Sequence, residues 1–376
     1  MKKTSNFAVA IVTTGRFHVA DLARELSAQG CDISFYCLSP SWKIRPFLGT
    51  KVRIISFFWW LAPLIVLSRG IPSLGGPAER IQSIAVDFLS SLFLRKCDVF
   101  IGMSGIALKS LHTAKKRFEA VTIIERGSRH ILSQKEILDS VRGAVKVPTW
   151  AIEREIKGYT EANSISIPSE HVEQSFLERG FPKSRLVRNP YGVDLSAFHN
   201  KAPKSPCAAN TAIIVGTWSY QKGCDLLTSA FRTLSGYSLL HIGMEGDAPL
   251  PMGEPWFIHS DPVSQAKLPE FYSRASVQVL PSRQDGLAMV LAQGLASGLV
   301  LVCSDKTGGK DLRQYTRNPG RIIEVSADVE SIRKGLLLAF DLVASQKLDS
   351  DPGDLSALSW KEYGKRYRTF LDQTSN

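Results

Sequence analysis

Short apolar runs alternate with longer amphipathic stretches along almost the whole chain. Short runs of this kind predict strands, and apolar positions repeated every three to four residues predict helices. Strands are expected at 7–13, 31–38, 52–56, 98–102, 120–125 and 163–167 in the first half, and at 211–216, 237–242, 255–258, 277–280, 299–303 and 320–324 in the second. Helices are expected between most of them, for example at 18–29, 169–179, 224–234 and 286–297. The alternation predicts parallel sheets built from βαβ units.

The pattern occurs twice and is interrupted once, at residues 199–210, where Lys, Pro, Ala and Asn dominate and no periodicity remains. A chain of 376 residues also exceeds the size that one core fills. We therefore expect two Rossmann-like, doubly wound α/β domains, over 1–198 and 211–354, joined by the linker and facing a central cleft. Residues 355–376 predict a closing amphipathic helix that packs back toward the first domain.

The composition is that of an ordinary globular protein, with 44% apolar and 22% charged residues. The six cysteines form no C-x-x-C pair, which favours reduced thiols and a cytoplasmic location. The first apolar run, residues 7–12, is short for a signal-peptide core, so a first strand is the better interpretation.

The net charge of +11 is unevenly distributed. Residues 1–200 hold 27 Lys and Arg against 17 Asp and Glu, whereas residues 201–376 hold 19 against 18. A basic half suits nucleic acid, an anionic membrane or an acidic substrate, although a merely solvated surface is an equal alternative. The chain shows no nucleic-acid-binding motif and its second half is nearly neutral, so no nucleic acid partner is expected.

Residues 51–70, "KVRIISFFWWLAPLIVLSRG", contain the most apolar segment of the basic half. Its core at 54–67 is shorter than the about 20 residues that a membrane-spanning helix needs. The aromatic run at 57–60 is typical of a bilayer interface. Two alternatives stay open: an interfacial element that gives peripheral contact with an anionic membrane, or a strand followed by a buried helix. The flanking basic residues are Lys51, Arg53 and Arg69.

Lys222 lies in "VGTWSYQKGCDLLTSAF", a strand, a polar turn and a helix. The start of a helix offers unpaired N–H groups and the positive end of the dipole, so a neighbouring lysine makes an anion site there. The alternative is a solvated lysine in the first helical turn. A second strand-turn-helix unit, "LPSRQDGLAMVLAQGLASG", places Asp285 at a helix start and Gln293 inside the helix. Asp285 would otherwise be a helix cap, but a buried Gln293 needs hydrogen-bond partners, which favours a ligand.

Residues 213–305 resemble the donor half of glycosyltransferase family 4, retaining enzymes of the two-domain GT-B type. In that family an Arg and a Lys in one turn contact the donor diphosphate, and two Glu separated by seven residues follow. Here "GTWSYQKG" keeps Lys222 and has Thr217 in place of the Arg, while Asp285 and Gln293 replace the two Glu. The segments "TTGRFHVADLARELSAQGCDISFY", "NPYGVDLSAF" and "WKEYGKRY" resemble further parts of the family. The resemblance covers most of the chain except roughly 40–95.

The resemblance implies both a donor site and catalytic residues. The candidates to replace the missing Arg are Arg16, Arg283, Arg126 and Arg129. His130 is the candidate to replace a family His that is absent after the strand at 120–125. The implied catalytic residues are Lys222, Asp285, Arg126 and His130. The implied donor-binding residues are Gly15, Arg16, Gly216, Thr217, Lys222, Arg283, Asp285, Gly286, Leu287, Ala288 and Gln293.

The function implied is retaining transfer of a sugar from a nucleotide-diphosphate sugar to a glycan or lipid-linked acceptor, as in bacterial-type surface polysaccharide or lipopolysaccharide synthesis. No metal and no cofactor is expected, because fixed cations and N–H groups can stabilise the leaving diphosphate. The alternatives are a non-catalytic sugar-binding or scaffold protein, suggested by the altered Arg and Glu positions, and a nucleotide-sugar epimerase or phosphorylase on the same plan.

Overall fold

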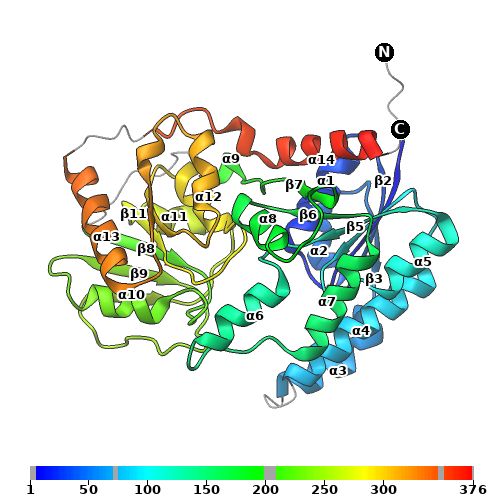
Figure 1. The fold of residues 1–376 in the computed structure, drawn as a ribbon, viewed down its shortest axis with the longest axis horizontal. Helices are drawn as coiled ribbons and strands as arrows, with labels where there is room; N and C mark the ends of the chain where they lie inside the picture. The colour runs from blue at the N-terminus through cyan, green and yellow to red at the C-terminus, as the bar shows by residue number, and fades with distance from the viewer. Residues whose placement is uncertain (1–5, 71–74, 199–208, 346–350, 375–376) are drawn as a thin grey trace.

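Two parallel sheets form the framework of the molecule (Figure 1). The computed structural model describes residues 6–70, 75–198, 209–345 and 351–374. In the described residues, one sheet has seven strands in the order β3-β2-β1-β4-β5-β6-β7, and the other has six in the order β10-β9-β8-β11-β12-β13. The predicted fold class, two Rossmann-like doubly wound α/β domains, is confirmed.

The strands of the first sheet are β1 (Ala8–Val12), β2 (Asp32–Cys37), β3 (Arg53–Ser56), β4 (Val99–Met103), β5 (Val121–Glu125), β6 (Ser164–Ile167) and β7 (Leu186–Arg188). Those of the second are β8 (Thr211–Val215), β9 (Ser238–Ile242), β10 (Phe257–Ser260), β11 (Val277–Leu280), β12 (Val300–Ser304) and β13 (Ile322–Val325). All twelve predicted strands are confirmed to within two residues, and β7 was not predicted.

The helices of the first half are α1 (Phe17–Ala28), α2 (Ser41–Leu48), α3 (Phe58–Gly70), α4 (Gly75–Phe93), α5 (Lys109–Phe118), α6 (Ile131–Ser140), α7 (Thr149–Glu161) and α8 (Glu170–Leu177). The remaining helices are α9 (Leu195–Phe198), α10 (Cys224–Phe231), α11 (Leu268–Tyr272), α12 (Met289–Ala296), α13 (Val329–Ala344) and α14 (Trp360–Thr374). The helix predicted at 286–297 begins only at Met289, because the preceding turn remains extended at Ala288.

Alternate residues along a strand pack into different hydrophobic cores on the two faces of the sheet. In β1, Val9 and Ile11 pack with α1, α2 and α14, whereas Ala10 and Val12 pack with α4 and α5. In β8, Ala212 and Ile214 join the core under α10 and α13. Apolar side chains on both faces of a strand are typical of parallel sheets that helices cover on both sides.

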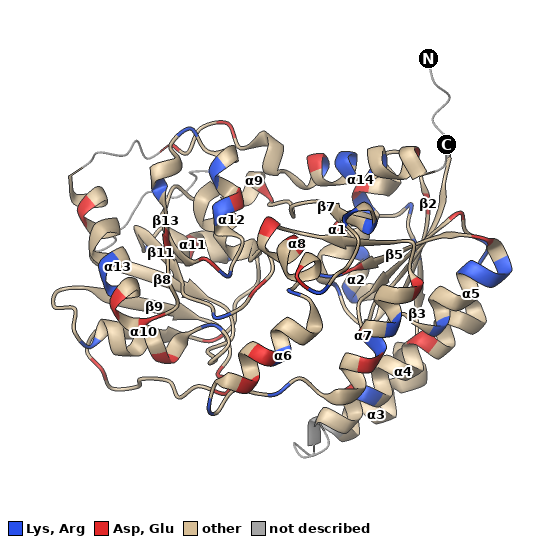
Figure 2. Ribbon diagram, viewed as in Figure 1, with Lys and Arg blue, Asp and Glu red and all other residues tan. Residues whose placement is uncertain are grey.

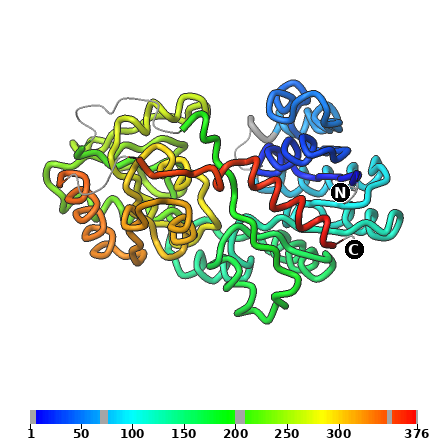
Figure 3. The backbone as a smooth tube through the Cα atoms, turned by 90° about the horizontal axis from the view of Figure 1, so that it is seen from above, coloured from blue at the N-terminus to red at the C-terminus, as the bar shows by residue number. Residues whose placement is uncertain are grey.

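The chain crosses between the two halves twice, and the crossings lie side by side (Figure 3). The backbone N–H of Val193 donates to the carbonyl of Leu358 over 2.8 Å. After the second crossing α14 returns to the N-terminal half and packs on α1. Residues 199–208 of the predicted linker lie outside the described residues, and the domain boundaries stay a prediction.

The apolar segment at 51–70 forms strand β3 and helix α3. Phe57, between them, is only 2% exposed, so this part of the aromatic run belongs to the core. Trp59 and Trp60 are 72% and 63% exposed. The alternative of a strand followed by a buried helix is therefore wrong for α3, whose aromatic side chains face outward.

Candidate active site

The turns after β8 and β11 are joined at the carboxyl ends of the second sheet. Gly223, at the start of α10, has a φ of 72°, and a Cβ there would lie 2.2 Å from the carbonyl oxygen of Pro281. Only glycine fits such an approach. The backbone N–H of Arg283 donates to the carbonyl of Gln221 over 2.9 Å. The two turns that carry Lys222 and Asp285 are thus held as one unit.

Lys222 and Asp285 form an ion pair. The Nζ of Lys222 contacts Oδ2 of Asp285, and the two side chains are 24% and 18% exposed. The other carboxylate oxygen, Oδ1, accepts from the backbone N–H of Gly286 over 2.9 Å. The structure brings together the two residues with the strongest predicted roles, although in this arrangement each neutralises the other.

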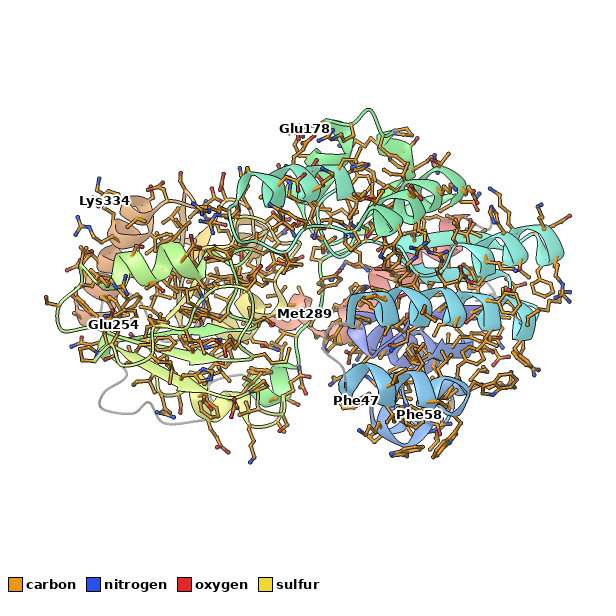
Figure 4. The ribbon with its side chains drawn as sticks, turned by 90° about the horizontal axis from the view of Figure 1, so that it is seen from below. Phe47, Phe58, Glu178, Glu254, Met289 and Lys334 are labelled. Atoms are coloured by element: carbon orange, nitrogen blue, oxygen red, sulfur yellow. The ribbon has the colours of Figure 1, made fainter. Side chains whose placement is uncertain are left out.

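Loops of the N-terminal half close over this unit. A Cβ built on Gly286 would lie 1.7 Å from the carbonyl oxygen of Gly127, so the two backbones are in direct contact. Ser128 donates to Oε1 of Gln284 over 2.8 Å across the same junction. Figure 4 labels Met289, the first residue of α12, near the junction of the two halves. The two halves are therefore in direct contact beside the turns that carry Lys222 and Asp285.

His171, at the start of α8, was not identified from the sequence. Its Nε2 lies 2.6 Å from the carbonyl oxygen of Asp285 and must therefore carry the proton, while Nδ1 accepts from the hydroxyl of Ser169 over 3.0 Å. Burial lowers the pKa of His171 to about 4, which keeps the ring neutral. A single histidine in a helical pattern gives no sequence signal for such a contact across two domains.

Arg126 is not placed as predicted. Its side chain is buried, and its NH1 donates to Glu155 over 2.9 Å. Its Nε and NH2 donate to the carbonyl of Arg129, and NH2 also donates to Gln134 over 2.7 Å. These contacts use the guanidinium to shape the loop at 126–130, and the predicted role of Arg126 at the donor diphosphate stays a prediction.

His130 is also not placed as predicted. It is 5% exposed. The centre of its ring lies 5.2 Å from that of Tyr159 and 4.9 Å from that of Phe176. Its Nδ1 accepts from the backbone N–H of Leu132, so it caps α6. Burial lowers its pKa to about 4. In this arrangement His130 is an uncharged helix cap inside an aromatic cluster, and its catalytic role stays a prediction.

Arg283 is committed within the C-terminal half. Its NH1 and NH2 bind both carboxylate oxygens of Asp225 over 2.6 and 2.7 Å, and NH1 also donates to the carbonyl of Tyr220. Paired in this way, Arg283 joins the two turns rather than presenting a cation to the cleft. Gly216 and Thr217 lie in the first of these turns, where Gly216 has a φ of 135°.

The first loop of the N-terminal half reaches the C-terminal half through Arg16. Its NH2 donates to Oε1 of Gln265 over 3.0 Å, and its guanidinium lies 3.6 Å from the ring centre of Phe47. Gly15 precedes it, and Phe17 follows with a φ of 33° and an exposed side chain. Strained backbone of this kind is often found at functional sites. Arg16 also lines a cavity of about 580 Å³ at the junction of the two halves.

Gln293 is buried in α12, as predicted, with Oε1 3.3 Å from the hydroxyl of Tyr272. The predicted N–H donors before α12 are partly used, since the N–H of Ala288 donates to Thr307. Gly286, Leu287 and Ala288 thus lie in the turn rather than in the first turn of the helix.

A buried polar cluster lies beneath the junction. Glu125, at the end of β5, accepts from the hydroxyl of Tyr367 over 2.7 Å and lies 2.9 Å from Nε2 of His18. The ring of Tyr191 lies 4.3 Å from that of His18, tilted by 34°, and its hydroxyl has no hydrogen-bond partner among the described residues. An unpaired buried hydroxyl beside Gly127 is unusual and suits a site that completes its contacts with a ligand.

Among the described residues, no group of three or more His, Cys, Asp or Glu is arranged to hold a metal ion. The absence of a metal from the reaction stays a prediction.

Part of the chain matches a known protein family. Residues 209–338, which include Lys222, Asp285 and Gln293, match the family described as Glycosyl transferases group 1. No curated protein matches the sequence.

Several solved structures share the fold over nearly the whole chain. Sucrose-phosphate synthase (tll1590) from Thermosynechococcus elongatus has a TM-score of 0.67 and 14% identity, over 98% of both chains. Anabaena Alr3699/HepE in complex with UDP and glucose has a TM-score of 0.65 and 12% identity, over 98% of this chain and 100% of that chain. The lipopolysaccharide outer core galactosyltransferase WaaB has a TM-score of 0.61 and 15% identity, over 98% of this chain and 99% of that chain. The whole-chain likeness shows the GT-B fold, and the matched segment supports a glycosyltransferase.

Proposed function

We propose that this protein is a retaining glycosyltransferase that moves a sugar from a nucleotide-diphosphate sugar to a glycan or lipid-linked acceptor. The observation that carries the proposal is the contact between Lys222 and Asp285 at the carboxyl ends of β8 and β11. This is the edge at which doubly wound sheets bind ligands. The loop at 126–130 closes over it from the other half.

The chemistry follows from the charge on Lys222. Breaking the bond between sugar and diphosphate develops negative charge on the leaving phosphate, and a fixed cation stabilises that charge. In the described arrangement Asp285 is the anion on Lys222. We infer that donor binding exchanges these partners, so that the diphosphate takes the lysine. Asp285, released, then accepts hydrogen bonds from hydroxyls of the donor sugar.

The nucleoside is proposed to lie near Gln293. Its amide is buried beside Tyr272, in the second turn of α12, the helix that follows the turn of Asp285. An amide can accept from a ribose hydroxyl without carrying a charge. Arg16, on the opposite loop, is the remaining cation of the predicted donor set and faces the C-terminal half through Gln265.

The donor, the chemistry and the cellular location can be specified further. We propose a hexosyl donor, a reaction that needs neither metal nor cofactor, and a role in surface polysaccharide or lipopolysaccharide synthesis at the cytoplasmic face of the membrane. UDP and glucose are bound in the HepE structure, so UDP sugars are the first donors to test.

The test is a screen of nucleotide sugars, with release of free nucleoside diphosphate as the readout, with and without a membrane extract as acceptor. Release that depends on both donor and extract is expected. A product whose anomeric configuration is inverted would contradict the retaining mechanism. Release in no combination would contradict catalysis.

A second candidate is a non-catalytic sugar-binding protein of the same fold. It is favoured by Thr217, which cannot supply an arginine fork, and by the use of Arg126 and Arg283 in internal contacts. This candidate predicts that sugar nucleotides bind, raise the thermal midpoint and are not turned over. An epimerase would instead change the donor sugar without any acceptor.

A further inference from the structure

Exposed apolar side chains are concentrated on one part of the N-terminal half. Among the described residues, 17 large apolar side chains are exposed, and ten of these lie on α2, α3 and α4. They are Trp42, Trp59, Trp60, Val66, Leu67, Ile81, Ile84, Phe88, Leu92 and Phe93, here called the aromatic face. A soluble protein rarely leaves so many exposed side chains together unless they meet another surface.

The side chains of the aromatic face form a connected patch. The ring of Trp42 lies 5.9 Å from that of Trp59, and the ring of Trp60 lies 5.7 Å from that of Phe93. Ile81, Ile84, Phe88 and Leu92 follow one another at helical spacing, so they form a stripe along α4. Figure 4 labels Phe58, which lies 5.6 Å from Trp42, at the outer edge of the N-terminal half.

The same region accounts for most of the net positive charge. Residues 40–118 hold 12 Lys and Arg against three Asp and Glu, so they account for +9 of the net +11. Of the three acids, Asp87 is buried and binds Arg154 over 2.6 Å, and Asp98 accepts from the N–H of Ala8. Figure 2 shows the Lys and Arg of α5 as a blue band at the edge of this half.

Basic side chains lie next to the apolar ones. The Nζ of Lys109 lies 4.3 Å above the ring centre of Phe88. Arg95 and Lys96, both exposed, come two residues after Phe93 in the chain. None of the described helices is both long and apolar enough to cross a membrane. Tryptophan and aliphatic side chains ringed by cations are suited to lie within the headgroup layer of an anionic bilayer.

We propose that the aromatic face docks on an anionic phospholipid bilayer, with α3 and α4 inserted into the headgroup layer. A protein partner or a second copy would not require the excess of cations. Two aromatic residues of α2 indicate how the protein is oriented on the bilayer. Trp42 lies on the aromatic face, whereas Phe47, more than one helical turn later, lies under Arg16 at the junction of the halves. The docked protein therefore presents this junction near the membrane surface.

The docking rests on exposed side chains and not on the proposed reaction; only its use for a lipid-linked acceptor rests on the proposed function. The test is flotation of the full chain with vesicles of phosphatidylcholine alone or mixed with phosphatidylglycerol, without donor or acceptor. Binding is expected only to the mixed vesicles, decreasing with salt. A protein that binds but transfers nothing would contradict the proposed function alone.

Two double variants separate the apolar and charged contributions. Trp59→Ser with Trp60→Ser, and Arg95→Glu with Lys96→Glu, should each lower the bound fraction about tenfold. The matched controls in the other half are Met252→Ser with Leu338→Ser, and Lys267→Glu with Lys334→Glu, which should bind like the wild type. Circular dichroism and the thermal midpoint show whether each variant is folded.

Bilayer insertion also has a spectroscopic readout that does not depend on variants. The emission of exposed tryptophans should shift to the blue on mixed vesicles and should be quenched by brominated lipid. No binding of the wild type at low salt would overturn the proposal, as would equal binding to neutral vesicles. Self-association in solution that the tryptophan changes abolish would assign the face to a second copy instead.

Discussion

Lys222 and Asp285, which follow different strands 63 positions apart, meet in an ion pair at the carboxyl edge of the second sheet. Both are predicted ligands of the donor. Because each neutralises the other, this ion pair attracts an anion less strongly than an unpaired lysine would. The proposed function has the donor diphosphate displace Asp285 from Lys222, and each partner can be changed separately.

Asp285→Asn removes the anion from Lys222 and keeps the shape of the side chain. Plain UDP should then bind as well as or better than to the wild type, because Lys222 no longer has to leave a carboxylate. Transfer should fall by at least about tenfold, because an amide accepts hydrogen bonds from the sugar less strongly. Calorimetry with UDP and with the UDP sugar separates the effects; an equal loss of affinity for both would contradict a sugar-specific role.

Gln293→Ala should weaken the binding of UDP and of the UDP sugar alike, because Gln293 is proposed to bind the nucleoside. Tyr272→Phe is the matched control, since it removes the other partner of the same hydrogen bond. Each change should cost about 1 kcal/mol of unfolding free energy. Calorimetric affinities decide the question: if Tyr272→Phe lowers the affinity as much as Gln293→Ala does, the amide acts through the protein and not on the ligand.

Gly286→Ala tests the contact between the two halves. Its Cβ would lie 1.7 Å from the carbonyl oxygen of Gly127, so the loops must separate. We expect a loss of about 1–3 kcal/mol in stability and of most transfer. Gly76→Ala is the control, because a Cβ there would meet nothing within 4 Å. Small-angle scattering of the folded variant should show a more open protein, and an unchanged, fully active Gly286→Ala would contradict the closed contact.

Acidification should destabilise the folded chain through His171. Burial lowers its pKa to about 4; the neighbouring Asp285 acts to raise it, whereas Arg129 and Lys306 act to lower it. Because the unfolded imidazole has a pKa of about 6.5, the unfolded state takes up the proton first as the pH falls. The stabilisation by neutral His171 is therefore complete above about pH 6.5 and is lost toward about pH 4.

Denaturant unfolding of the wild type and of His171→Gln at several pH values in this range measures the effect. The variant should show a shallower decrease of stability, while His130, whose pKa is also lowered to about 4, keeps a part of the dependence in both proteins. Parallel curves for the two proteins would contradict a neutral, interface-bound His171.

The strands and the fold class were predictable because parallel strands are buried on both faces. Such strands appear in the sequence as short, nearly continuous apolar runs, like "TAIIV" of β8. Their length is that of a strand and too short for a helix. β7 was missed since its three residues are half-exposed and include Arg188. The start of α12 was misplaced because a turn and a first helical turn have the same local composition here.

The site was predictable in part. Lys222 and Asp285 lie on turns whose position depends on the strands alone, and Gln293 was the polar residue of a buried helix. The internal partners of Arg126 and His130, here Glu155 and the backbone of α6, could not be predicted, because a charge or imidazole beside a strand end gives no sign of them. His171 depends on how the two halves meet, which no local pattern encodes.

Turnover by Lys222→Ala tests the central claim most directly. With the donor and acceptor found in the screen, the rate of nucleoside diphosphate release should fall at least about a hundredfold, since one fixed charge at a developing oxyanion contributes roughly 3–4 kcal/mol. Lys334→Ala, which removes an ion-paired lysine from α13, should keep the wild-type rate. A folded Lys222→Ala protein that turns over at a near-normal rate would contradict the assignment of Lys222 to the leaving diphosphate.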